Sequence, residues 1–304
     1  MKIGILVVYY VADGDESLLD LHLHKIAAHS RTVPYTIYAA ANRLQPHFRE
    51  RIASEPNLKI CTLPDTELRS SWEHSFYLDA LAREAISDGA THLCTLDVDS
   101  FPIRDGWIET LLERIAEGNV LAAASRREDG ETMLPHPSCL FMPAEFVTRY
   151  SPTFFPDKDA IQAPAFQAFL HETRQMPDSG IGYGYILYTE DLAWARLYRT
   201  NKVDDHFLLA GIYGDVVFHL GSASRDDRLF HSRGTVGLGY RVADFIERRI
   251  MYCPPGSTRK ALVDLLTNRA KERYAERQKQ TYETIRERLL REPDDYIAYL
   301  RGVG

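Results

Sequence analysis

The first 125 residues alternate between continuously apolar runs and stretches with helical periodicity. The apolar runs span residues 3–10, 35–41, 58–63, 91–97 and 120–125, and the helical patterns between them span 17–30, 47–54, 72–87 and 107–117. Apolar runs without polar alternation are typical of strands that helices cover on both faces. The pattern predicts an α/β fold with a Rossmann-like, mostly parallel sheet flanked by helices. Such sheets bind ligands at the carboxyl ends of their strands.

The regular alternation stops after residue 125. Loops rich in Pro, His, Ser and aromatic residues follow, as at 133–139 and 151–156. Beyond them we predict a helix at 189–200 and a strand at 215–220. The segment 221–239 is rich in Gly, Ser and Arg, and we interpret it as a lid loop that closes over a ligand.

The last part of the chain has a different character. Residues 259–291 are highly charged, with acidic and basic residues interspersed and a partial apolar stripe of helical spacing. We therefore divide the chain into one domain, 1–253, and a C-terminal helical extension, 254–304. This extension would pack on the domain or on a second subunit, so a homodimer through these helices is one expected assembly.

Composition and charge exclude several classes of partner. The chain has 304 residues, a net charge of -7 and a pI near 5.9, so no global positive field would attract it to nucleic acid or to anionic lipids. No apolar run approaches the roughly 20 residues of a transmembrane helix. The four cysteines lie far apart without a Cys-x-x-Cys pair, so we expect no structural zinc and a reducing, cytoplasmic location. Peripheral attachment to the inner face of the membrane is the alternative.

Two aspartates follow directly after the apolar residues 91–96. Asp97 and Asp99 are separated by one residue, so in an extended chain their side chains point to the same side, about 7 Å apart. Two carboxylates so placed repel each other unless a cation lies beside them. Magnesium or manganese suits hard carboxylate oxygens and also binds diphosphate oxygens. The pair therefore predicts a divalent metal site, and an acidic turn after a strand is the alternative.

Three segments together resemble a known family. They are Ser70–Ser75 at the start of a helical pattern, Thr95–Ile103 around the aspartates, and Gly106–Trp107 before the next helix. Over about residues 1 to 235 the chain is similar to GT-A glycosyltransferases, specifically to bacterial family-two-like members. The resemblance implies a metal-dependent enzyme that moves a sugar from a UDP- or GDP-sugar to a hydroxyl of a glycan or another acceptor, with inversion. It also implies that residues 1–125 bind the nucleotide-sugar and that 126–253 form the acceptor half.

The same resemblance implies the ligands of the metal. Asp99 would bind the ion directly, and Asp97 would contact the donor ribose or a metal-bound water. The family also places a late His on the metal, and His219, at the end of a strand-like run, matches it in this chain. Imidazole together with two carboxylates favours manganese over calcium. A structural role for the imidazole is the alternative.

Inverting transfer needs a carboxylate that removes the proton of the acceptor hydroxyl. Asp178 lies in Pro-Asp-Ser-Gly, which resembles the Asp-Ser/Thr-Gly motif of some family members, and Asp191 lies in Thr-Glu-Asp, which resembles the Glu-Asp motif of others. Helix capping near Ser179 and Thr189 also explains both aspartates. We favour Asp178, because the glycines at 180, 182 and 184 would let a ligand approach closely.

The base of the donor needs hydrogen-bond and stacking partners. Asp65 follows the third predicted strand and could accept hydrogens from uracil or guanine. Tyr9 and Tyr10, at the end of the first predicted strand, could stack on the base. An ordinary strand-to-helix turn explains Asp65 equally well.

The diphosphate of the donor needs positive or N–H groups. Ser71 and His74 lie at a predicted helix start, where free backbone N–H groups attract phosphate. Arg225 and His231, in the lid loop, could close over the diphosphate. Both could equally be solvated loop residues.

Other classes of protein fit the sequence less well. A haloacid-dehalogenase-like phosphatase also places Asp-x-Asp after an apolar strand, but its motif comes on the first strand and continues with Thr or Val, where this chain has Phe101. A sugar-nucleotide pyrophosphorylase needs a Gly-rich, Arg-containing loop, which residues 11–16 do not supply. A catalytically inactive glycan-binding relative would keep the fold without turnover. Metal-dependent use of a nucleotide-sugar separates these possibilities.

Overall fold

The computed structural model describes residues 1–221 and 279–303. The chain divides into two units, one made of Met1–Ser224 with Asp294–Gly304 and the other of Arg225–Pro293. The described part of the second unit contains a helix from 279 to 291. The first unit contains the sheet and all of the candidate residues that the structure describes.

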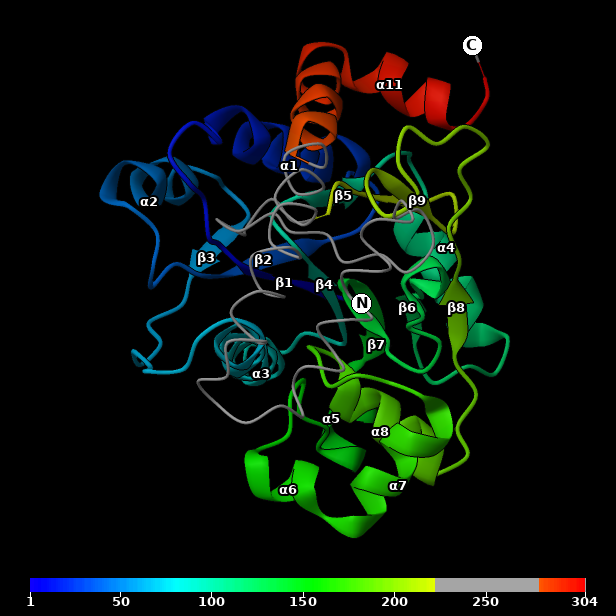
Figure 1. The fold of residues 1–304 in the computed structure, drawn as a ribbon. Helices are drawn as coiled ribbons and strands as arrows, with labels where there is room; N and C mark the ends of the chain where they lie inside the picture. Colours follow the sequence, from blue (N-terminus) through cyan, green and yellow to red (C-terminus); the bar gives the residue numbers. More distant parts are fainter. Residues whose placement is uncertain (222–278, 304) are drawn as a thin grey trace, which may run out of the picture. The chain divides into compact units, whose positions relative to one another are not determined.

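A seven-stranded sheet forms the centre of the first unit (Figure 1). Its strands are β1 Ile3–Val8, β2 Tyr35–Ala40, β3 Leu58–Ile60, β4 His92–Leu96, β6 Ala122–Ala124, β7 His136–Pro143 and β8 Ala195–Leu197. The spatial order is β3-β2-β1-β4-β7-β6-β8. β7 is antiparallel to its neighbours β4 and β6, and the other neighbouring pairs are parallel. The expected mostly parallel α/β sheet is confirmed.

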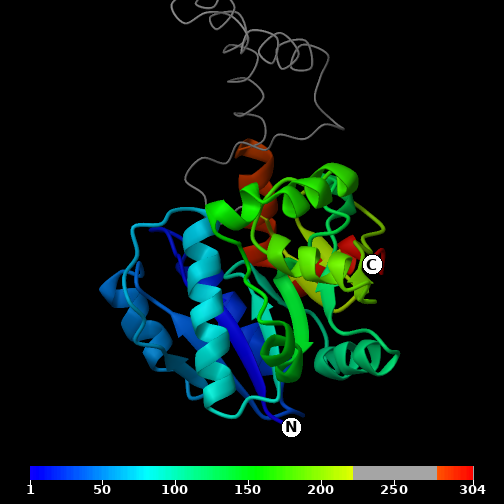
Figure 2. The ribbon, with the colours of Figure 1, turned by 90° about the horizontal axis from the view of Figure 1, so that it is seen from below.

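Helices cover both faces of this sheet (Figures 1 and 2). One core contains residues of α1 Glu16–His29, α2 Pro46–Ala53 and α4 Trp107–Ala116, and the other contains residues of α3 Ser71–Ser87, α5 Ala144–Tyr150 and α8 Ile181–Thr189. Along β1 the side chains alternate between the two cores, with Ile5 and Val7 in the first and Leu6 in the second. A strand with both faces buried has to be continuously apolar, as the sequence of β1 is.

The central strand β7 is the largest departure from the sequence expectation. Its first residues belong to a segment that we expected to be a loop, because two prolines flank His136. In the structure the strand pairs with β4 from Cys139 onward. Pro137 lies where the register with β6 shifts, so its missing N–H falls at an irregular point of the ladder. Pairing with β4 on one side and β6 on the other thus makes this segment a strand, although its prolines favour a turn.

Helices also fill the rest of the segment in which we expected irregular structure. α5, α6 Lys158–Gln162, α7 Pro164–Thr173 and α8 follow β7 in that order. The helix predicted at 189–200 is wrong, because α8 ends at Thr189 and β8 follows. Residues 195–197 pair in parallel with β6, and this pairing overrides the local helical pattern.

A second, three-stranded sheet contains β5 Ser100–Pro102, β9 Gly211–Tyr213 and β10 Val217–His219. Its order is β5-β10-β9, and both pairs are antiparallel. β10 lies within the predicted strand 215–220. Because β5 follows the two aspartates directly, this sheet attaches the end of β10 to the turn that carries them.

The end of the chain belongs to the first unit. In and just beyond α11 Pro293–Leu300, Tyr296 donates a hydrogen bond to Asp205, and Arg301 forms two hydrogen bonds to the carboxylate of Asp215. These contacts attach α11 to the segment that leads into β9 and to the turn before β10. The boundary that we predicted at residue 253 lies outside the described residues. Within residues 1–221 and 279–303, no helix is both long and apolar enough to cross a bilayer.

Candidate active site

Asp97 and Asp99 lie on a tight turn between β4 and β5. The hydroxyl of the fully buried Ser100 shapes this turn, because it accepts a hydrogen bond from the backbone N–H of Asp97 at 2.8 Å and donates to the carbonyl of Ser138 at 2.8 Å. The backbone N–H of Ser100 in turn donates to the carbonyl of Asp97. The two aspartates therefore leave the carboxyl end of β4 on a fixed backbone.

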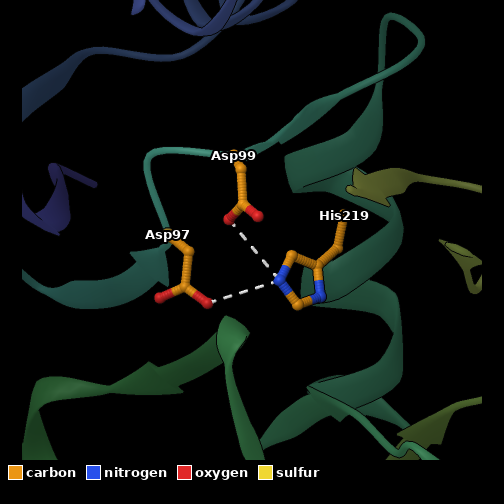
Figure 3. A group of neighbouring side chains, drawn as sticks. All are labelled: Asp97, Asp99 and His219. Carbon is orange, nitrogen blue, oxygen red and sulfur yellow. Dashed lines mark ion pairs between the residues drawn. The ribbon is translucent and has the colours of Figure 1, made fainter. Parts of the chain in front are cut away.

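His219 reaches these aspartates through the second sheet. It pairs with Ser100 across the antiparallel β5–β10 ladder, and the next N–H, that of Leu220, donates to the carbonyl of Asp99 at 2.9 Å. Its Nε2 lies 3.6 Å from Oδ2 of Asp97 and 3.5 Å from Oδ1 of Asp99 (Figure 3). The structure thus brings together residues that are more than a hundred positions apart in the sequence.

The three side chains fit a divalent cation. One ligand atom from each of Asp97, Asp99 and His219 lies within 4.8 Å of the other two. Metal–ligand bonds of about 2.1 Å place neighbouring ligand atoms of an octahedron about 3 Å apart and opposite ones about 4.2 Å apart. Small side-chain movements reach such a geometry. Two carboxylates and one imidazole suit magnesium or manganese, and Asp99 and His219 are buried where bulk water cannot screen them.

The carboxylates of Asp97 and Asp99 lie close together, so a cation bound beside them would be stabilised. Burial raises the pKa of Asp97, His74 and His219 act to lower it, and the adjacent Asp99 adds to the rise. Behind the turn, Nδ1–H of His22 donates to the carbonyl of Ser100 at 2.7 Å, and burial lowers the pKa of His22 to about 4. His22 is therefore neutral at physiological pH and does not compensate the carboxylates.

The start of α3 lies beside the aspartates. The helix begins at Ser71, and His74 in its first turn places Nε2 3.4 Å from Oδ1 of Asp97. Ser71 donates from its hydroxyl to Oδ1 of Asp178 at 2.5 Å, and the N–H of Ser179 donates to the same oxygen at 2.8 Å. The structure thus joins Ser71, His74, Asp97 and Asp178 in one neighbourhood.

Asp191 lies elsewhere. It follows the last turn of α8, is exposed and has a positive φ of 49°. Asp178 and Ser179 precede the first turn of the same helix, and α8 separates its two ends by about 12 Å. Neither aspartate side chain caps α8, whose N-cap is Gly180. The geometry therefore places Asp178, and not Asp191, in the neighbourhood of Asp97 and the start of α3.

The glycines of α8 have a different purpose from the one we expected. A Cβ atom at Gly180, Gly182 or Gly184 would lie 2.2, 2.1 or 2.0 Å from a backbone carbonyl oxygen of Pro135, Thr153 or Met133, respectively. They permit close approach of the protein's own backbone, not of a ligand. Their packing fixes α8, and with it Asp178, against the segment that leads into β7 and against the loop that follows α5.

The candidates for binding the nucleotide base are more scattered. Tyr9 is 1% exposed and its hydroxyl contacts His22, so its ring belongs to the core and is not free to stack on a base. Tyr10 is 37% exposed. Asp65 accepts a hydrogen bond from Asn42. The lid candidates Arg225 and His231 lie outside the described residues.

Sequence reasoning missed a group of charged and polar residues after β6. Arg126 donates from Nη1 to Nε2 of His136 at 3.0 Å and lies 3.8 Å from Glu131. The ring of His136 is 5.4 Å from that of His219, between centroids. Burial raises the pKa of Glu131 to about 7, Arg126 opposes the rise, and the charge of Asp178 adds to it. Arg126 lies two residues after the carboxyl end of β6, where ligands of such sheets bind, so the rule that identified Asp97 applies to it as well.

Comparison with known proteins finds similar solved structures but no similar sequence. No protein-family model matches the sequence, and no curated protein matches it by sequence. A mutant of Drosophila β1,4-galactosyltransferase 7, solved with manganese, UDP-Gal and xylobiose, is 13% identical; the match covers 64% of this chain and 64% of that chain, less than two thirds of its length, with a TM-score of 0.38.

Two further neighbours come from a bacterium and a mammal. S. aureus TarS in complex with UDP-GlcNAc is 12% identical, with 94% of this chain and 92% of that chain covered and a TM-score of 0.43. Mouse xyloside xylosyltransferase 1, in its apo form, is 12% identical, with 65% and 85% covered and a TM-score of 0.39. The first and third of these neighbours are named as glycosyltransferases, and TarS was solved with a UDP-sugar.

Proposed function

We propose that this protein is a metal-dependent glycosyltransferase that moves a sugar from a nucleotide-sugar to an acceptor hydroxyl. One observation carries the proposal: the Asp97–Asp99–His219 cluster lies at the carboxyl end of β4, where sheets of this kind bind ligands, and the first turn of α3 lies beside it. The cluster supplies a cation site, and the free N–H groups of a helix start attract phosphate. A cation next to phosphate-binding groups is what a diphosphate leaving group requires.

The proposed metal would neutralise the negative charge that develops on the diphosphate as the bond to the sugar breaks. Asp97, Asp99 and His219 would hold it. The start of α3 would orient the diphosphate with its N–H groups, and we assign magnesium or manganese as the ion because the ligand set suits both.

Asp178 would take the proton of the acceptor hydroxyl. Its Oδ1 already accepts from Ser71 and Ser179, and Oδ2 has no donor among the described residues, so Oδ2 is the atom that can receive this proton. The acceptor oxygen would attack the anomeric carbon as the bond to the diphosphate oxygen breaks, and the bonding electron pair would leave with the diphosphate. Attack from the opposite side inverts the anomeric centre.

Thermal unfolding with ligands tests the proposal. The full chain would be heated with MnCl2 and UDP-glucose, UDP-galactose, UDP-GlcNAc or GDP-mannose in turn, each with and without the metal. A donor at about 100 times its dissociation constant stabilises the folded state by about 2.7 kcal/mol. We expect one nucleotide class to raise the melting temperature when Mn2+ is present, and Asp99→Asn to abolish the rise.

Asp20→Asn is the matched control, because Asp20 makes a surface ion pair with Arg51 on a different part of the molecule. It should respond to donor as the native chain does. The proposal is wrong if no UDP- or GDP-sugar shifts the transition, or if Asp99→Asn leaves a donor-induced shift intact. Release of phosphate from p-nitrophenyl phosphate without any donor effect would favour the phosphatase.

A further inference from the structure

The side chain of His74 lies between the metal ligands and Asp178. Its Nε2 is 3.4 Å from Oδ1 of Asp97, and its Nδ1 is 3.4 Å from Oγ of Ser179. Ser179 directly follows Asp178 and donates its N–H to Oδ1 of that residue at 2.8 Å. One imidazole thus contacts both a carboxylate of the cation site and the turn that carries the proposed base.

The hydroxyl of Ser179 has a partner for its one hydrogen and for each of its lone pairs. It donates to the carbonyl of Ser71 at 3.2 Å, accepts from the hydroxyl of Ser75 at 3.0 Å and faces Nδ1 of His74. A hydroxyl has one hydrogen to donate and two lone pairs to accept with, so these three neighbours satisfy it. Ser179 and Ser75 are both buried, so water does not compete for these bonds.

The backbone of the Asp178 turn is held by other means. The next residue, Gly180, has φ of 99° and no room for a Cβ against the carbonyl of Pro135, and Gly184 packs as closely on Met133. This packing holds the backbone from Gly180 onward. The residues before it, Asp178 and Ser179, are held by side-chain hydrogen bonds as well, so the contacts of His74 bear on how they respond to the metal site.

We propose that His74 is a positioning residue that couples the cation site to Asp178. When a divalent ion binds Asp97, that carboxylate turns toward the ion, the imidazole follows it, and the Ser179–Asp178 turn adjusts through Nδ1. That Asp178 is the proton acceptor rests on the proposed function, whereas the coupling itself is a property of the protein and of the metal alone.

NMR of the full-length, 15N-labelled protein during titration with MgCl2 tests the coupling without any sugar. The amide of Leu220, which donates to the carbonyl of Asp99, reports on the cation site, and the amide of Ser179 reports on the Asp178 turn. We expect both signals to shift with one midpoint in the native chain. His74 is 26% exposed at its side chain, so its substitution should not unfold the protein.

Two substitutions of His74 each remove one of its two contacts, the one with Asp97 or the one with Ser179. In His74→Asn the amide can replace Nδ1 but does not reach Asp97, and in His74→Gln it can replace Nε2 but does not hold Ser179. Both should keep the Leu220 response and reduce the Ser179 shift at least about threefold, while Thr189→Ala, at the far end of α8, should change neither.

The possible outcomes separate the two proposals. A full Ser179 shift in both His74 variants overturns the coupling and leaves the proposed function in place. Absence of any Mg2+-dependent shift at Leu220 in the native chain overturns the cation site and the coupling together. A reduced Ser179 shift with an intact Leu220 response supports the coupling.

Discussion

The two sides of the candidate site are held in place by different forces; the proposed metal side is Asp97, Asp99 and His219, and the proposed acceptor side is Asp178 with its turn. Asp97, Asp99 and His219 lie at strand ends, where the backbone hydrogen bonds of β4, β5 and β10 determine their positions. Asp178 lies on a turn that is positioned by glycine packing and by side-chain hydrogen bonds to α3. Ladder geometry comes from backbone hydrogen bonds, whereas packing of the second kind depends on which residues meet at each contact. Perturbing each side should therefore produce different defects.

The largest expected effect separates chemistry from binding. Asp178→Asn keeps an oxygen that accepts from Ser71 and Ser179 but cannot take a proton, so transfer to an acceptor should fall at least about a hundredfold. Initial transfer rates and Mn2+ affinity, measured on the same preparation, would show whether the metal side is untouched.

Asp191→Asn is the control for that variant, because Asp191 is exposed beyond the other end of α8. It should transfer sugar at the native rate. Native activity in Asp178→Asn, or a loss confined to Asp191→Asn, would contradict the assignment of the base.

The second effect concerns the packing that positions Asp178. In Gly184→Ala the new Cβ would lie 2.0 Å from the carbonyl oxygen of Met133, which is backbone and cannot turn away. We expect the free energy of unfolding to fall by about 1–3 kcal/mol, the usual cost of overpacking. Urea denaturation would measure this, with Thr189→Ala in the same helix as a control. An unchanged midpoint would show that α8 does not pack on this segment as described.

The smallest effect is the pH dependence that Glu131 adds to the acceptor side. Its pKa is raised to about 7 from an ordinary 4.5, mainly by burial, with Arg126 opposing the rise and Asp129, Asp178 and Glu128 adding to it. The folded state therefore binds the proton more tightly than the unfolded chain. The contribution of Glu131 to the free energy of unfolding is therefore greatest below pH 4.5. It is lost as the pH rises toward 7, by about 1.4 kcal/mol for each unit of pKa difference between the folded and unfolded states.

Glu131→Gln removes this titration. Thermal unfolding at pH 5 and pH 8 would give the melting temperature of the variant minus that of the native chain. We expect this difference to be more positive at pH 8 than at pH 5. A difference that does not change with pH would show that Glu131 is ionised in the folded state at both pH values.

The sequence predicted the strand ends that carry Asp97, Asp99 and His219 better than the surroundings of Asp178, for physical reasons. An apolar strand followed by Asp-x-Asp is a local signal, and a strand was expected at 215–220, so the order of elements and two of the three clustered residues needed no knowledge of tertiary contacts. His219 was chosen by family resemblance, and the pairing of β10 with β5 that brings it to the aspartates joins distant segments.

The acceptor side depends on contacts that no local pattern encodes. β7 contains Pro137 and looked like a loop, yet it is a central strand because β4 and β6 pair with it. The glycines of α8 looked like room for a ligand, yet carbonyl oxygens of Met133, Pro135 and Thr153 fill that room. Burial of Glu131 follows from the same packing, so its raised pKa could not be read from the sequence.

Isothermal titration calorimetry with MnCl2 tests the central claim most directly. The full chain should bind one Mn2+, Asp99→Asn should lose this binding because a neutral amide replaces a charged ligand, and His219→Ala should weaken it by a smaller factor. His92→Ala is the matched control for the imidazole, since His92 lies at the opposite end of β4. If the native chain and Asp99→Asn bind Mn2+ with equal affinity, Asp97, Asp99 and His219 do not form the metal site.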